Sequence, residues 1–155
     1  VMVATQSMIH PETVGQNVVV IGGGEVGVEA GIHLAKTGRQ VTVLEMRDKL
    51  AADSTIMHFR SMFKAYWEGV PTFRGLCSVT VTGVTPEGVR YRDAAGAEQF
   101  LPADTVVVST GMTPLREQAL DFYGSAGRFY LIGDCKKPGT VQSAMRDAFA
   151  AASQI

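Results

Sequence analysis

The residues best suited to chemistry form a glycine-rich run, Gly22-Gly23-Gly24-Glu25-Val26-Gly27. This GxGxxG spacing follows an apolar run and opens a helical pattern, which is the context of a loop that binds a dinucleotide pyrophosphate. Gly22 would permit the tight turn, Gly24 would let the pyrophosphate approach the backbone, and Gly27 would let the helix lie close to the sheet. The unpaired N–H groups at the start of the helix would then face the phosphates. The alternative is a glycine-rich turn that binds no ligand.

An acidic residue, Glu45, ends a second apolar run about 20 positions beyond the loop, as the dinucleotide fingerprint requires. A carboxylate there accepts hydrogen bonds from the adenosine ribose and repels a 2′-phosphate, so it favours NAD over NADP. Arg39 and Arg47 lie near enough in the sequence to soften this preference, because an arginine can pair with a 2′-phosphate. The alternative for Glu45 is a solvated glutamate at a strand end.

The remaining reactive side chains lack a recognisable arrangement. His10, His33 and His58 are scattered without metal-ligand spacing, and Cys77 and Cys135 form no CxxC motif. We therefore expect no metal site and no redox dithiol. No residue is identified as a catalytic acid, base or nucleophile.

The elements that position the glycine loop and Glu45 can be inferred from periodicity. Residues 17–21 are apolar on both faces, which is typical of a central parallel strand. Residues 26–37 follow a helical period with small residues on one face, and residues 40–45 form a second strand. A strand, helix and strand of this length predict a right-handed βαβ unit.

The middle of the chain predicts an antiparallel meander. Strands are expected at 77–85, 88–92 and 98–101, separated by turn signals, and a long apolar strand at 104–109. This order differs from a repeating βα pattern. The predicted fold class is α/β, a Rossmann-like three-layer domain with a mainly parallel sheet and an antiparallel β-meander.

The two ends of the chain have weaker signals. Residues 1–16 are predicted to be irregular, and residues 114–127 a loop or short helix. Residues 128–132 predict a last strand, and Thr140 is expected to cap the final helix.

The composition is that of an ordinary globular protein. Of the 155 residues, 46% are hydrophobic and 19% are charged, and the formal net charge is −1. That charge gives no general attraction to nucleic acid or to a membrane surface. No apolar run approaches the roughly 20 residues that cross a bilayer, and no secretory signal is present, so a cytoplasmic location is expected. The chain starts at Val1 and stops inside a helical pattern, so we expect a piece of a longer protein.

Three ordered motifs together resemble a known family. The runs VVVIGGGEVGVEAGIHLAKTGRQVTVLE, VVVSTGMTP and FYLIGDCKKPGTVQSAMRDAFAAA, with the meander between the first two, are similar to flavin- and NAD(P)H-dependent oxidoreductases of the pyridine nucleotide-disulfide oxidoreductase superfamily. The greatest similarity is to the 2,4-dienoyl-CoA reductase and bile-acid-inducible NADH:flavin oxidoreductase group, over about residues 14–155. In that family an NAD(P)-binding domain is inserted into an FAD-binding domain. The resemblance implies an N-terminal linker over residues 1–16, an NAD(P)-binding domain over 17–113, and a strand–helix segment of the FAD-binding domain over 114–155.

The resemblance also implies roles for individual residues. The glycine run and Glu45 would bind NAD(H), and Glu29 would lie toward the nicotinamide, although the helical pattern alone places Glu29 on an exposed face. Thr110 and Gly111 would match the segment where the chain leaves the NAD domain, with Gly111 permitting close approach of the dinucleotide. Gly133 and Asp134 would match the second FAD motif, in which the aspartate bonds the ribityl chain, and the helix after Thr140 would point toward the flavin.

Several parts of the family pattern are absent from this sequence. They are the first FAD motif, the FMN-binding barrel and the cysteine cluster for an iron–sulfur centre. We therefore expect the chain to recognise NAD(H) without holding FAD well, and to be inactive alone. In the parent enzyme, hydride would pass from nicotinamide C4 to N5 of FAD, and the resemblance implies FMN and an iron–sulfur cluster as further cofactors. The expected partners are the dinucleotide, the FAD- and FMN-binding parts of the parent and a second copy in a homodimer, with no nucleic acid and no membrane.

Two other interpretations remain open. A regulatory nucleotide-sensing Rossmann module, such as the domains that gate potassium channels, also has a GxGxxG and an acidic strand end, but it continues with further βα units. The fragment could also derive from a pyridine-nucleotide disulfide reductase, because the redox cysteine pair of such an enzyme would lie outside this sequence.

Overall fold

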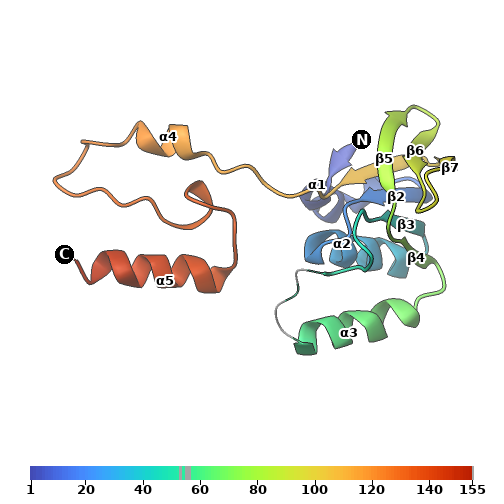
Figure 1. The fold of residues 1–155 in the computed structure, drawn as a ribbon, viewed down its shortest axis with the longest axis horizontal. Coiled ribbons are helices and arrows are strands. Elements are labelled where there is room, and N and C mark those ends of the chain that lie inside the picture. The colour runs from blue at the N-terminus through green and yellow to red at the C-terminus, as the bar shows by residue number, and fades with distance from the viewer. Residues whose placement is uncertain (53, 55–56, 155) are drawn as a thin grey trace. The chain divides into compact units, whose positions relative to one another are not determined.

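The computed structural model describes residues 1–52, 54 and 57–154. It divides into two compact units, Val1–Thr110 and Gly111–Ile155, which are described separately (Figure 1).

The first unit is built on a five-stranded parallel sheet in the order β1-β8-β2-β3-β4. Its strands are β1 (Met2–Val3), β2 (Asn17–Ile21), β3 (Gln40–Leu44), β4 (Phe73–Leu76) and β8 (Thr105–Val108). The helices of this unit are α1 (Ala4–Ile9), the 3₁₀ helix η1 (Pro11–Thr13), α2 (Glu25–Lys36) and α3 (Met57–Glu68). A second, antiparallel sheet consists of β5 (Thr80–Thr85), β6 (Gly88–Arg92) and β7 (Glu98–Pro102).

Two hydrophobic clusters show why β2 is apolar on both faces. Val18 and Val20 pack in one cluster with Leu34 of α2, whereas Val19 packs in the other with Val89 of β6. Successive side chains of a strand point to opposite faces, so the valine run is buried on both sides. Helices cover one face of the parallel sheet and the meander covers the other (Figure 1), which confirms the predicted three-layer α/β fold.

The sequence prediction was wrong for residues 1–16 and incomplete for the sheet. Residues 2–9 form β1 and α1 instead of an irregular segment, and β1 pairs in parallel with β8. A strand of 2 residues and a helix of 6 residues are too short for a periodic pattern to develop. The edge strand β4 was also missed, because Gly75 interrupts its apolar pattern and only pairing with β3 defines it.

The second unit contains α4 (Arg116–Leu120), the 3₁₀ helix η2 (Gly133–Cys135) and α5 (Val141–Ala152). The predicted strand at 128–132 is wrong, because these residues form no strand. The described part of this unit holds no other strand that could supply ladder hydrogen bonds. The predicted cap is confirmed: Thr140 Oγ1 accepts a hydrogen bond from Ser143 N, and Ser143 Oγ accepts one from Thr140 N.

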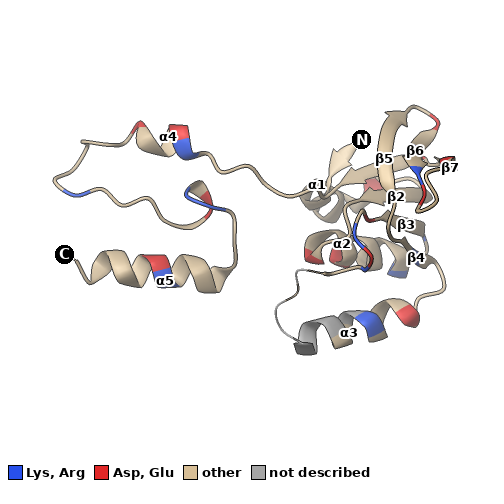
Figure 2. Ribbon diagram, in the orientation of Figure 1, with Lys and Arg blue, Asp and Glu red and all other residues tan. Residues whose placement is uncertain are grey.

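Both signs of charge are interspersed along the described ribbon (Figure 2). Within the residues that the structure describes, no helix is long and apolar enough to span a bilayer.

Candidate dinucleotide-binding site

The sheet topology brings three strand ends to one edge. β2 lies between β3 and β8, with Ile21 beside both Leu44 and Val108. The glycine loop, Glu45 and Thr110 therefore all follow the carboxyl ends of neighbouring parallel strands. From β2 the chain proceeds to β3 on one side and later returns to β8 on the other. Such a switch point is where open α/β sheets bind ligands.

The glycines of the loop have different surroundings. Gly22 has a φ of +102°, and a Cβ there would collide with the carbonyl oxygen of Ser109. A Cβ on Gly27 would collide with the carbonyl oxygen of Gly22. In contrast, a Cβ on Gly24 would meet no heavy atom within 4 Å. Two glycines are thus required by the packing of the loop itself, and Gly24 borders open space.

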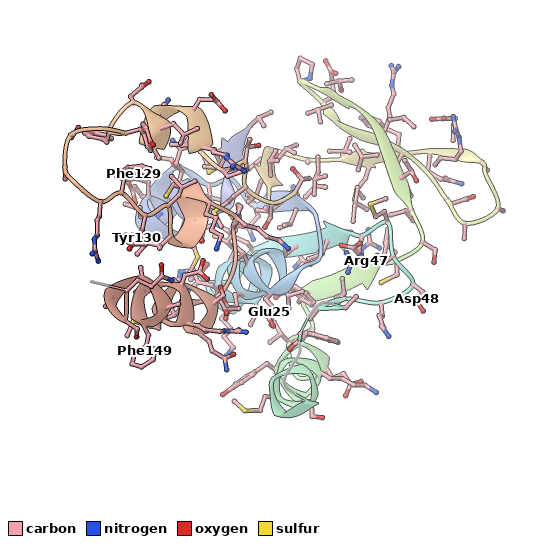
Figure 3. All side chains as sticks on the ribbon, turned by 60° about the vertical axis from the view of Figure 1, so that its left-hand side comes forward. Glu25, Arg47, Asp48, Phe129, Tyr130 and Phe149 are labelled. Atoms are coloured by element: carbon pink, nitrogen blue, oxygen red, sulfur yellow. The ribbon has the colours of Figure 1, made fainter. Side chains whose placement is uncertain are left out.

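The first turn of α2 is suited to an anion. Gly24 is the N-cap residue, its carbonyl accepts from Val28 N at 3.0 Å, and no side chain caps the turn. The first N–H groups of a helix have no partner within the helix, and the helix dipole favours negative charge at this end. Glu25 stands in the same turn, and Arg47 and Asp48 lie in the loop after β3 (Figure 3).

Glu45 is buried and fixed at the end of β3. Its side chain and backbone are only 8% exposed. Oε2 accepts a hydrogen bond from Gly23 N at 2.6 Å, and Oε1 accepts one from Arg47 N at 2.8 Å. The alternative of a solvated strand-end glutamate is therefore wrong. Each carboxylate oxygen has a second lone pair, so Glu45 can still accept hydrogen bonds from a ribose.

Arg39 lies at the opposite end of the sheet from Glu45, which corrects the expectation that it softens the coenzyme preference. It precedes β3, whereas Glu45 follows it, and about 20 Å of extended strand separates them. Its Nε donates to the carbonyl of Val14 at 3.2 Å, and its Nη2 donates to the carbonyl of Pro11. Arg39 therefore holds the N-terminal segment against the sheet.

We expect Arg39→Ala to leave the ratio of NADH to NADPH affinity unchanged. It should instead lower the free energy of unfolding by about 1–3 kcal/mol, because the hydrogen bonds of the partly exposed guanidinium group to Val14, Pro11 and Thr37 are lost. Chemical denaturation and calorimetric titration of both coenzymes would measure the two effects. Arg39→Lys is the control, because it keeps the positive charge but not the planar guanidinium group that donates several hydrogen bonds. A changed affinity ratio in Arg39→Ala would contradict this assignment.

Not all of the sequence-predicted residues are brought together. Glu29 is exposed on α2, as its pattern predicts. Gly111, Gly133 and Asp134 belong to the second unit. There, Asp134 is exposed, and its Oδ1 accepts a hydrogen bond from Gly139 N at 3.1 Å. The roles of these four residues in cofactor binding stay predictions.

Two features of this edge were not anticipated from the sequence. Leu50 packs against the glycine loop, although nothing in its local pattern distinguishes it from an ordinary loop leucine. Cys77 lies beyond β4, where burial, together with the negative charges of Glu45 and Asp48, raises the pKa of its thiol. Cys77 is therefore a neutral thiol near pH 7, consistent with an unreactive cysteine.

Comparisons with known proteins place this arrangement in a family. The sequence model of the pyridine nucleotide-disulphide oxidoreductases matches residues 2–148. An NADH oxidase from Thermoanaerobacter brockii is 32% identical over 90% of the chain, and a bilirubin reductase from Mediterraneibacter gnavus is 32% identical over 94%. The chain spans only 21% and 22% of the lengths of these two relatives.

Solved structures show the same fold. A 2-naphthoyl-CoA reductase complex has a TM-score of 0.86 at 24% identity, covering 99% of this chain and 23% of that one. Thioredoxin reductase from Lactococcus lactis has a TM-score of 0.73 at 19% identity, covering 96% and 55%. The fold, the ordered motifs and the sequence match agree, and the chain belongs to the pyridine nucleotide-disulphide oxidoreductases, a family of flavoprotein oxidoreductases.

Proposed function

We propose that the first unit binds NAD(H) and orients its nicotinamide for a flavin held by other parts of a longer parent enzyme. The surroundings of the loop glycines are the main support. Gly22 and Gly27 are required for packing, whereas the space in front of Gly24 is open and lies beside the uncapped first turn of α2. A pyrophosphate that approached through that space would meet the unpaired N–H groups and the positive dipole end of the helix.

The residues of this unit would bind and orient the coenzyme. The N–H groups of the first turn of α2 would donate hydrogen bonds to the pyrophosphate. Gly22 N already donates to the carbonyl of Leu44, and Gly23 N already donates to Glu45. Glu45, already fixed by Gly23 N and Arg47 N, would accept hydrogen bonds from the adenosine ribose. Bound NADH supplies a hydride from nicotinamide C4, which N5 of FAD would accept in the parent. The chain itself needs no acid or base for this step.

The second unit does not by itself fit FAD. Asp134, the residue expected to bond the ribityl chain, is exposed and already accepts from Gly139 N. Val141, Met145 and Phe149 of α5 are between 65% and 81% exposed, so they enclose no pocket in this unit. FAD binding would need the remaining parts of the parent.

The identity of the parent is a finer proposal. We propose an enoate or 2,4-dienoyl-CoA reductase-like enzyme that also carries FMN and an iron–sulfur cluster and acts in the cytoplasm, with a homodimer as its assembly. The support is the resemblance of the motifs and a relative named cinnamate reductase from Clostridium sporogenes, 26% identical over 98% of the chain. The meander disfavours a regulatory module built from further βα units.

The proposal is tested by titrating the purified chain with NADH, NADPH and FAD in a calorimeter. We expect saturable NADH binding with a Kd between about 1 μM and 1 mM, the range typical of enzyme substrates, and weaker binding of NADPH. FAD should not bind in this range. If neither nicotinamide coenzyme binds, the proposal is wrong. Tight FAD binding would contradict the assignment of the second unit.

A further inference from the structure

Leu50 occupies a socket formed by two glycines from different elements. A Cβ built on Gly23 of the glycine loop would lie 2.6 Å from Leu50 Cδ2. A Cβ built on Gly75 of β4 would lie 2.6 Å from Leu50 Cδ1. Leu50 is only 7% exposed and belongs to the core cluster on the helical side of the sheet. Because real Cβ atoms do not come this close, an alanine at either position would force the tip of Leu50 to move from its present place.

The segment that Leu50 anchors connects Glu45 to the glycine loop. At its start, Arg47 N donates to Glu45 Oε1, and the Arg47 carbonyl accepts from Ser78 N at 2.7 Å. At its end, Ala51 N donates to the carbonyl of Gly23 at 2.7 Å. Glu45 and Ala51 thus hold the N–H and the C=O of the same glycine. The Leu50 side chain packs against the Cα side of that glycine, whose N–H and C=O make these two hydrogen bonds.

Ala51 shows that this segment is held under constraint. Its φ is +49°, in the left-handed region that alanine rarely adopts. It is fully buried directly after Leu50, so packing and the bond to Gly23 must maintain this conformation. Loss of the Leu50 side chain would remove the apolar part of that support.

We propose that Leu50 is a positioning residue for coenzyme recognition: it fixes residues 46–51 and Gly23. The carboxylate of Glu45 then faces the adenosine ribose, and the loop presents the first turn of α2 to the pyrophosphate. This inference rests on the proposed NAD(H) function. Leu50 acts through Glu45 and Gly23 and need not touch the coenzyme itself.

The test compares two truncations of the same residue type in the same core cluster. Leu50→Ala should weaken binding of both NADH and ADP-ribose about tenfold, since the affinity lost is comparable to one well-placed hydrogen bond. Leu34→Ala, in α2 and completely buried, should lower the midpoint of thermal unfolding at least as much but leave both affinities unchanged below that midpoint. Equal affinities in Leu50→Ala and the wild type would overturn the inference. So would an equal loss in Leu34→Ala, because the effect would then be general destabilisation.

Gly75→Ala provides a second, independent test, including the case in which Leu50→Ala does not fold. The new methyl group should displace the tip of Leu50 and weaken NADH binding severalfold. In the Leu50→Ala background the displaced atoms are absent, so adding Gly75→Ala should cause little further loss. Additive losses of NADH affinity would show that Gly75 and Leu50 act independently, and would contradict the proposal that Gly75 acts by accommodating Leu50. If the wild-type chain binds no NADH, the proposed function fails before either comparison is made.

Discussion

Replacing Gly24 with alanine should nearly abolish NADH binding while the first unit stays folded. The added methyl group would meet no heavy atom of the described structure within 4 Å, so it disturbs no packing. Alanine is a poorer N-cap residue than glycine, and the free energy of unfolding should fall by only about 1 kcal/mol or less. The methyl group would occupy the space proposed for the pyrophosphate. Losing two hydrogen bonds to charged oxygens, each worth about 1.5–3 kcal/mol, predicts a loss of affinity of at least about 100-fold.

Two matched glycine substitutions make this result specific. Gly83→Ala, in β5, also adds a methyl group with no heavy atom within 4 Å and should leave NADH affinity unchanged. Gly27→Ala should instead destabilise the fold by about 1–3 kcal/mol or more, since its methyl group collides with the Gly22 carbonyl oxygen. Calorimetric titration and thermal unfolding of the three variants would separate binding from folding. Wild-type affinity in Gly24→Ala would show that the pyrophosphate does not lie at this loop.

Replacing Glu45 with alanine should weaken NADH binding by about 10- to 100-fold and NADPH binding by much less. The variant loses the acceptor for the ribose hydroxyls, which only NADH presents in full. It also loses the negative charge that repels the 2′-phosphate of NADPH, so the two changes partly cancel for NADPH. Titrating the same preparation with both coenzymes gives the ratio of the loss of NADH affinity to the loss of NADPH affinity.

The same substitution should also destabilise the fold, and the binding experiment must allow for it. Gly23 N, which is buried, would lose its acceptor at a cost of about 1–3 kcal/mol, and the part-buried Arg47 N would add a smaller cost. Titrations should therefore be made well below the midpoint of unfolding of the variant. Glu87→Ala, in the exposed turn between β5 and β6, is the control and should change neither property. An equal loss for NADH and NADPH would remove Glu45 from the ribose site.

The part of the fold closest to the proposed site was predictable because its signals are local. β2 was predicted with its observed bounds, and α2 and β3 within one residue, since glycines mark the ends of strong apolar patterns. Once β2 and β3 are paired in parallel, their carboxyl ends lie at the same edge of the sheet, which places Glu45 beside the glycine loop.

The remainder depends on contacts between distant parts of the chain. The strand predicted at 128–132 has a strand-like composition, but strand formation needs a neighbouring strand, and residues 111–154 of the second unit provide none. Arg39 lies near Glu45 in sequence and far from it in space, because an extended strand separates them. The socket of Leu50 depends on Gly75, which is 25 positions later and lies in a strand that the pattern did not reveal.

The central claim is that the glycine loop and the first turn of α2 hold the coenzyme pyrophosphate. The most direct test is to follow the backbone amide resonances of the ¹⁵N-labelled chain while NADH is added. We predict saturable shifts at Gly23, Gly24 and Val26, with no change at Gly83 in the meander. Saturable NADH binding that leaves the loop amides unshifted would contradict the account, as would the absence of any shift at saturating NADH.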